Sequence, residues 1–274
     1  MIKNLKMTVL IDNIAAEPLI SEWGLSILIE ADGRKILLDT GASGQFARNA
    51  ELLQADLAAV EVDVLSHAHY DHADGMETFF ACNDRAEFLL HENCRENCFG
   101  LKDGALEYNG IRRGTLSRFA DRIRFVSGVC QVTDGIWLVP HRAADYTRIA
   151  RRNDLYVRED RCCRPDNFAH EQSLVAETEK GLVIFNSCSH TGVKNTLTDV
   201  REMLGDRKVY AYVGGLHLYK LTDEELSALA DELRASGISQ ILTGHCTGEH
   251  AFAFLRQRLG DQIRQISAGF TCVF

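Results

Sequence analysis

The sequence lacks any apolar stretch of the roughly 20 residues that a membrane-spanning helix needs. Its first residues, MIKNLKMTVLIDN, also lack a long apolar core followed by a small-residue cleavage site, so they predict no signal peptide. Low-complexity tracts are absent as well, and hydrophobic residues make up 46% of the chain, which argues against global disorder. We therefore expect a cytoplasmic protein with a packed core and no membrane partner.

Proline is scarce, with three residues in 274, and no stretch rich in proline, glycine and serine interrupts the sequence as a linker would. We expect a single domain spanning residues 1–274. Positive charge is also in deficit, with 30 lysines and arginines against 39 acids and a net charge of -9. An acidic chain is a poor partner for a phosphate backbone, so a nucleic-acid partner is disfavoured.

Cysteine, in contrast, is plentiful at nine residues, an odd number. In a cytoplasmic chain these are expected to be free thiols. Two local pairs stand out, Cys94 with Cys98 and Cys162 with Cys163. Their spacing matches no standard zinc or iron–sulfur signature, so buried or loop thiols are the favoured interpretation. A second metal site, which would require these cysteines to converge, is the alternative.

Short apolar or alternating runs predict strands, and runs with a 3.6-residue period predict helices. The predicted strands are residues 26–30, 35–41, 60–65, 181–186, 209–213 and 238–243. The predicted helices are residues 45–57, 193–204, 221–237 and 250–260. Asp32–Gly33 marks a hairpin turn, Gly205 a helix end, and Thr222 with Glu225 a capping box. These elements indicate an α/β fold in two halves, with an irregular segment at about residues 91–167.

Part of that middle segment is rich in arginine. Residues 142–164 contain seven arginines against four acids, in a chain that is acidic overall. The favoured interpretation is a solvated loop or lid. The alternative is a lid that recruits an anion, because guanidinium groups suit phosphate and carboxylate.

The stretch SHAHYDHADG, residues 66–75, holds three of the ten histidines and two aspartates. His67 and His69 are two residues apart, so from an extended segment both side chains point the same way and can reach one ion. Asp71 and His72 are adjacent, so a turn there would bring both to a second ion nearby. Imidazole and carboxylate together suit zinc, iron or manganese, and four potential ligands within six residues predict a metal site.

Three further histidines each follow the end of a predicted strand: His190 in NSCSHTG, His217 in GGLHLY and His245 in TGHCTG. Sites in α/β folds lie at the carboxyl ends of strands, so these histidines are expected at the same site. The remaining four lack this context and are interpreted as structural or surface residues. They are His91, His141, His170 and His250.

LLDTG, HAHYDH, the histidine of SCSHTG and that of GHCTG, in this order, resemble the motifs of the metallo-β-lactamase superfamily over nearly the whole chain. The resemblance implies an αββα sandwich, in which two mixed β-sheets face each other with helices outside and a metal site at one edge. PDNFAHEQSLV, KGLVIFNSCSHTGVKN and GGLHL are similar to the branch typified by dihydropterin–aminobenzene ribose-phosphate synthase. The chain departs from that branch at Asn167, His170 and Asn186–Ser187.

The resemblance also implies a set of metal ligands. One ion would be held by His67, His69 and His190, and a second by Asp71, His72 and His245. Asp39 of LLDTG would brace the ligand loop from behind. The superfamily often has an aspartate that bridges the two ions after the strand at 209–213, where this chain has GGLHL. His217 is expected either to take that place as a ligand or to face the substrate.

Metal ions lower the pKa of bound water toward neutrality, so such a site would supply hydroxide at physiological pH. We expect two divalent metal ions, zinc first with manganese or iron as alternatives, and Asp71 as the catalytic residue that orients the hydroxide and carries its proton. The chain is thus predicted to be a metal-dependent hydrolase, or a related transferase, acting on a small anionic ester, lactone or phosphoester. Two alternatives stay open: a mononuclear iron oxygenase or other redox enzyme, and a non-catalytic ligand-binding effector.

Overall fold

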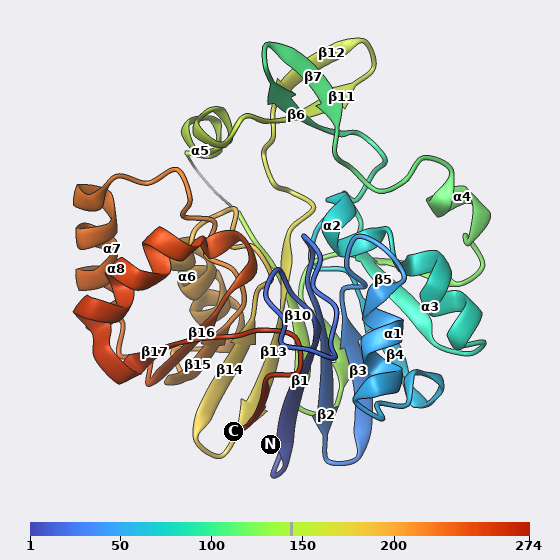
Figure 1. Ribbon diagram of the computed structural model, residues 1–274, viewed down its shortest axis with the longest axis horizontal. Helices are drawn as coiled ribbons and strands as arrows, with labels where there is room; N and C mark the ends of the chain where they lie inside the picture. The colour runs from blue at the N-terminus through green and yellow to red at the C-terminus, as the bar shows by residue number, and fades with distance from the viewer. Residues whose placement is uncertain (143–144) are drawn as a thin grey trace.

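The structure is a computed structural model that describes residues 1–142 and 145–274. Two seven-stranded β-sheets lie face to face, and helices cover the outer face of each (Figure 1). A smaller, four-stranded sheet stands above one end of this sandwich in the view of Figure 1. The predicted αββα sandwich of two mixed sheets is confirmed.

The first sheet is formed by the N-terminal half together with the last strand. Its strands, in spatial order, are β18 (Thr271–Val273), β1 (Leu5–Ile11), β2 (Ser26–Ala31), β3 (Arg34–Leu38), β4 (Val62–Val64), β5 (Glu87–His91) and β8 (Ile123–Val126). Strands β18 to β3 pair antiparallel and β3 to β8 pair parallel. On its outer side lie α1 (Gln45–Leu52), α2 (Tyr70–Ala73) and α3 (Met76–Cys82).

The second sheet is formed by the C-terminal half. Its spatial order is β17 (Ile263–Gln265), β16 (Gln240–Thr243), β15 (Val209–Val213), β14 (Gly181–Phe185), β13 (Gln172–Thr178), β10 (Ile136–Pro140) and β9 (Cys130–Thr133). The strands from β14 to β17 are parallel, because a helix returns the chain between β14, β15, β16 and β17. These helices are α6 (Val193–Leu204), α7 (Asp223–Ala235) and α8 (Glu249–Leu259).

Apolar residues on both faces of each sheet build a four-layer core. In β2, Ile27 and Ile29 point between the sheets, whereas Leu28 packs under the helices of the outer layer. In β14, Val183 faces the other sheet and Ile184 faces α6 to α8. Strands covered on both sides read as continuous apolar runs, and this explains the strands predicted at residues 26–30 and 181–186.

The predicted helix ends and turns agree with the structure in most places. Helix α6 ends at Gly205, and α7 begins with the predicted capping box, in which Thr222 and Glu225 exchange side-chain and backbone hydrogen bonds. The helix predicted at 45–57 ends earlier, at Leu52, since the chain turns through a left-handed residue at Gln54 and forms a short 3₁₀ turn (η1, Leu57–Ala59).

The prediction of an irregular segment at 91–167 was wrong. Besides β8, β9 and β10, it contains a four-stranded sheet and two short helices. These are β6 (Cys98–Lys102), β7 (Ala105–Tyr108), β11 (Leu155–Glu159), β12 (Cys162–Pro165), α4 (Thr115–Arg118) and α5 (Tyr146–Asn153). The strands β7 and β12 are largely exposed and so lack the apolar alternation that reveals a strand. Tight turns at Asp103–Gly104 and Asp160 join the hairpins.

No helix within residues 1–142 and 145–274 is long and apolar enough to cross a membrane. All nine cysteines are free thiols, as predicted. Cys94 and Cys98 are buried, and Cys162 and Cys163 are exposed on β12.

Strand β4, which leads into the histidine-rich motif, carries a buried acid. Asp63 is fully buried, and neither of its carboxyl oxygens has a hydrogen-bond partner among the described residues. Burial, and after it the charge of Asp39, raises the pKa of Asp63 well above its usual range. A carboxyl whose pKa is higher in the folded chain favours folding at low pH. That contribution is lost as the pH rises from the unfolded pKa toward the folded one.

We expect Asp63→Asn to raise the free energy of unfolding at pH 8 by roughly 1–2 kcal/mol, because the folded chain no longer has to bury a charge or hold a proton there. The gain should shrink at pH 5. Urea unfolding at both pH values measures it, with Asp84→Asn at an exposed position as the control. Equal stability of Asp63→Asn and wild type at pH 8 would contradict this account of Asp63.

Candidate metal centre

The predicted site residues meet at one edge of the sandwich, where strands of both sheets end. Five of them lie in loops that begin at the carboxyl end of a strand: Asp39 after β3, His67 after β4, His190 after β14, His217 after β15 and His245 after β16. All five are buried. The arrangement is that of other α/β folds, whose sites form where the carboxyl ends of strands open outward.

One group of three histidines converges on a point. His67, His69 and His190 each offer a ring nitrogen, and these atoms lie within 4.8 Å of one another. The Nε2 atoms of His67 and His190 are 3.2 Å apart. Burial, and after it the neighbouring imidazoles, lowers the pKa of His69 to about 3 and those of His67 and His190 well below the usual range. Neutral rings keep a lone pair for a metal ion.

A second group lies beside the first. The Nε2 atoms of His72 and His245 are 3.1 Å apart, and Asp71 Oδ2 lies 3.3 Å from His245 Nε2 and 3.7 Å from His72 Nε2. Burial alone would raise the pKa of Asp71, but the charges of His72 and His245 hold it well below the usual range. Burial alone would lower the pKa of His245, but Asp71 raises it to about 9. This group therefore attracts a positive charge.

Asp39 decides which nitrogen of two histidines is free. Its Oδ2 accepts hydrogen bonds from Ser66 Oγ at 2.7 Å and from His72 Nδ1 at 2.8 Å, and its Oδ1 accepts one from the Ser66 amide at 2.7 Å. Because Ser66 gives its hydroxyl proton to Asp39, it accepts one from His67 Nδ1, 2.8 Å away. Both histidines carry their proton on Nδ1 and turn the Nε2 lone pair inward.

Asn13 fixes the proton of His245 on Nδ1 in the same way. Its amide orientation is set by Nδ2, which donates to the carbonyl of His245 at 3.1 Å, and by Oδ1, which accepts from the Gly24 amide at 3.3 Å. The Oδ1 atom also lies 3.1 Å from His245 Nδ1, so that nitrogen is the donor. The Nε2 atoms of His72 and His245 thus face each other beside a carboxylate, and they repel unless a proton or a metal ion lies between them. This donor set fits a divalent metal ion.

Three buried carboxylates hold the backbone of the ligand loops. Asp39 accepts the amide of Ser66, Asp12 accepts the amide of His245 at 3.0 Å, and Glu171 accepts the amide of His190 at 2.7 Å. Sequence reasoning missed Asp12, Asn13 and Glu171. A signal existed for the first two, because Asp12 and Asn13 directly follow the apolar run of β1.

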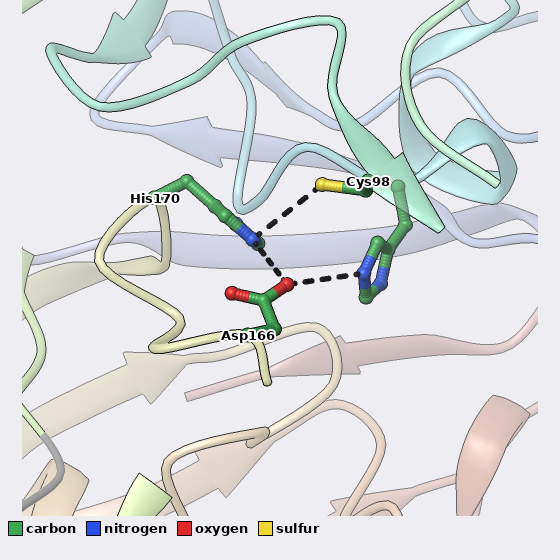
Figure 2. A group of neighbouring side chains, drawn as sticks. Cys98, Asp166 and His170 are labelled. Carbon is green, nitrogen blue, oxygen red and sulfur yellow. Dashed lines mark hydrogen bonds and ion pairs between the residues drawn. The ribbon is translucent and has the colours of Figure 1, made fainter. Parts of the chain in front are cut away.

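His170, predicted to be structural or a surface residue, is buried behind His69. Figure 2 shows His170, Cys98 and Asp166 pointing toward one another. Together with His69 these side chains place four potential metal ligands within 4.8 Å. The amide of Ala68, however, donates to His170 Nδ1 at 3.2 Å, so Nε2 carries the proton and donates it to Asp166 Oδ2 at 3.0 Å. A protonated nitrogen cannot bind a metal ion.

We therefore assign Asp166 and His170 a supporting role. Asp166 Oδ2 also lies 4.0 Å from His69 Nε2, a buried atom with no hydrogen-bond partner among the described residues. The carboxylate favours a proton on this far nitrogen, which leaves His69 Nδ1 free to bind a metal ion. Sequence reasoning also missed Asp166.

His217, predicted either to bind a metal ion or to face the substrate, lies inside the site. It is buried, and neither ring nitrogen has a hydrogen-bond partner within residues 1–142 and 145–274. Its ring centroid is 4.3 Å from that of His190. It adopts a left-handed backbone with φ 52°, as Asp39, Ser189 and His245 also do, and such strain concentrates at functional sites.

Glycine is required just before His217. A Cβ at Gly214 would overlap the carbonyl oxygen of Asn186, and a Cβ at Gly215 would overlap Cys246 Sγ. The pair therefore allows the loops after β14, β15 and β16 to touch one another.

A cavity of about 130 Å³ opens beside His190 and His217, under α5. Arg152 and Asn153 of that helix line it. Elsewhere in the arginine-rich segment, Arg148 pairs with Asp145 at 2.8 Å and Arg164 pairs with Glu159 at the surface, which fits the solvated-lid interpretation. Residues 143 and 144 of the segment lie outside the described residues.

The three other histidines lie away from the site's converging nitrogens. His141 is buried and bonded to Asp199 and Ser173, His91 is buried at the end of β5, and His250 is exposed and paired with Asp223. These positions agree with structural and surface roles.

The comparisons with known proteins agree with this geometry. The model of the metallo-beta-lactamase superfamily matches residues 24–81, which include the histidine-rich motif and Asp39. Over 98% of this chain and 96% of the relative, the sequence is 28% identical to 7,8-dihydropterin-6-methyl-4-(β-D-ribofuranosyl)-aminobenzene-5′-phosphate synthase of Methanocaldococcus jannaschii. An uncharacterised protein of the same organism is 24% identical over 91% of this chain and 93% of its own.

Among solved structures, Tm1679, a metal-dependent hydrolase of the β-lactamase superfamily, superposes with a TM-score of 0.83. It is 26% identical, and the match covers 98% of both chains. The metallo-β-lactamase fold protein YhfI of Bacillus subtilis matches with a TM-score of 0.58 at 10% identity, over 99% of this chain and 100% of its own, and shows a shared fold.

We expect Ser66→Ala to weaken metal binding roughly 10- to 100-fold, because His67 loses the acceptor that fixes its proton on Nδ1. Competition with a chromophoric chelator measures the affinity. Ser187→Ala is the matched control, since the Ser187 hydroxyl is buried in a neighbouring loop without a hydrogen-bond partner among the described residues. Equal affinities of the two variants would argue against control by Ser66.

Proposed function

Because the chain belongs to the metallo-β-lactamase superfamily, we propose that it is a metal-dependent hydrolase, or a related transferase, acting on a small anionic ester, lactone or phosphoester. The observation that carries this proposal is the set of inward-facing Nε2 atoms beside Asp71. The ions would be two divalent metals, zinc first. When bound, they would lower the pKa of water to near neutrality and stabilise the oxyanion of an attacked carbonyl or phosphoryl group.

The proposed ligands follow the two groups. His67, His69 and His190 would hold one ion, and Asp71, His72 and His245 the other. Three of these histidines would be oriented through the ring nitrogen that faces away from the ion: His72 by Asp39, His67 by Ser66 and His245 by Asn13.

Asp71 is the proposed catalytic residue. It is the carboxylate among these ligands, it is buried, and its low pKa keeps it ionised at neutral pH. An ionised carboxylate beside the attacking water accepts its hydrogen bond, aims its lone pair and takes up its proton.

Arg152 is the proposed contact for the anionic part of the substrate. It lines the cavity next to His190 and His217, and its partner Glu225, 3.0 Å away, neutralises it in part. A guanidinium that lines this cavity suits a phosphate or a carboxylate. The synthase relative carries a 5′-phosphate in its name, which supports a phosphorylated substrate and keeps a transferase reaction open.

We expect Asp71→Asn to lower kcat by roughly 10²- to 10⁴-fold, because the proton acceptor is lost while the shape is kept. His67→Ala should lower activity and metal content together. The assay is hydrolysis of a panel of phosphoesters, lactones and carboxylic esters by the zinc-loaded protein. His250→Ala, at an exposed position, is the control. Full activity of both site variants would falsify the proposal.

We expect Arg152→Gln to raise KM for anionic substrates about tenfold with little change in kcat, because it removes binding that is equal in ground and transition states. An uncharged analogue should show no such rise in KM. Arg148→Gln, on the exposed side of the same helix, is the matched control. If KM rose equally for neutral and anionic substrates, Arg152 would not be an anion contact.

A further inference from the structure

Cys188 lies between the two groups of proposed metal ligands. It is buried in the loop after β14, two residues before His190. Its Sγ is 3.3 Å from His72 Nε2. It belongs to three groups whose donor atoms lie within 4.8 Å of one another: with His67 and His72, with His190 and His217, and with His245 and Cys246. One sulfur therefore reaches nitrogens of both proposed ligand sets.

The charge of the site calls for such a donor. Two divalent ions carry more positive charge than Asp71, the single carboxylate among the proposed ligands, can offset. The loop after β15 supplies no acid, because it reads GGLHL. The charge of Asp39 is already engaged by His72 and Ser66.

His217 provides a second, independent indication that a ligand or metal ion binds beside Cys188. It is 91% buried, since its exposed fraction is 9%. Both its ring nitrogens lack a hydrogen-bond partner among the described residues, and one of them belongs to the group with Cys188 and His190. A buried imidazole without a partner is costly unless something absent from the protein chain satisfies it.

We propose that the thiolate of Cys188 is a ligand shared by the two metal ions, in the place of the missing bridging carboxylate. This inference rests on the proposed metal centre. When the sulfur binds, its proton leaves to solvent and the bonds to the metal ions form, with no change in oxidation state. Ligands of a tetrahedral zinc ion bound at about 2.0–2.3 Å lie roughly 3.5 Å apart, close to the 3.3 Å between Cys188 Sγ and His72 Nε2.

Cys246 is a positioning residue in this arrangement. Its Sγ lies 3.3 Å from Cys188 Sγ and 3.7 Å from the Cys188 carbonyl oxygen, and it packs under Gly215. It can donate its S–H to the sulfur of Cys188 and hold it in place. The thiolate also bears on metal choice, because sulfur favours zinc over manganese.

X-ray absorption at the zinc edge tests the proposal on protein purified without chelators and kept reduced. Wild type, Cys246→Ser and the distant control Cys272→Ser should all show a zinc–sulfur distance of about 2.3 Å. Cys188→Ser should lack it and should bind its second zinc ion at least about tenfold more weakly. Cys188→Asp should restore the second ion without the sulfur signal, because it returns the anionic charge.

A wild-type spectrum without sulfur would overturn the proposal even if Cys188→Ser failed to fold. So would a sulfur signal that Cys188→Ser keeps or that Cys246→Ser abolishes, since either would place the bond on another thiol. The outcome is separate from the proposed hydrolysis. Zinc–sulfur bonding in a protein that cleaves nothing in the panel would refute the hydrolase and leave the ligand assignment intact.

Discussion

The site depends on a buried carboxylate. Asp39 lies at the end of β3, fully buried, and an ionised carboxylate in that position needs hydrogen-bond donors to offset the loss of water. It receives them from the Ser66 amide, the Ser66 hydroxyl and His72 Nδ1. These bonds tie the end of β3 to the end of β4. They also set the proton positions of His67 and His72, so the inward lone pairs follow from one side chain.

The same device recurs on the other sheet and joins the two. Asp12, at the end of β1 in the first sheet, accepts the amide of His245 in the second sheet. The contact of 3.1 Å between His72 and His245 therefore spans the sandwich, and its length depends on how the two sheets pack. That packing is fixed by the apolar layer between them, in which residues such as Ile27 and Val183 are buried. Because the core is rigid, donor atoms from distant segments are positioned precisely enough to lie within hydrogen-bond distance of one another.

Much of the fold and the potential ligands could be predicted because their signals are local. The spacing of His67, His69, Asp71 and His72 is contained in six residues, and strands buried on both faces are continuous apolar runs. Among the residues that orient the ligands, Asp39 was predicted, but Asp166 and Glu171 could not be. Asp166 and Glu171 contact ligand histidines that are distant in sequence, His69 and His190, and these become neighbours only after folding. The small sheet of β6, β7, β11 and β12 escaped prediction because its exposed strands carry no apolar period.

The anions around the site divide into two kinds, and this division bears on His217. One kind faces away from the space between the histidines. These carboxylates accept hydrogen bonds from backbone amides or from the far nitrogen of a ligand histidine, and they belong to Asp12, Asp39 and Glu171. Asp71 faces into that space, and the thiols of Cys188 and Cys246 lie beside it. If Cys188 supplies the shared negative charge, His217 need not bridge. One of its nitrogens lies with Cys188 and His190, and its ring also lines the cavity that Arg152 shares. An imidazole in that position can donate a hydrogen bond to an anionic substrate, so its two predicted roles are compatible.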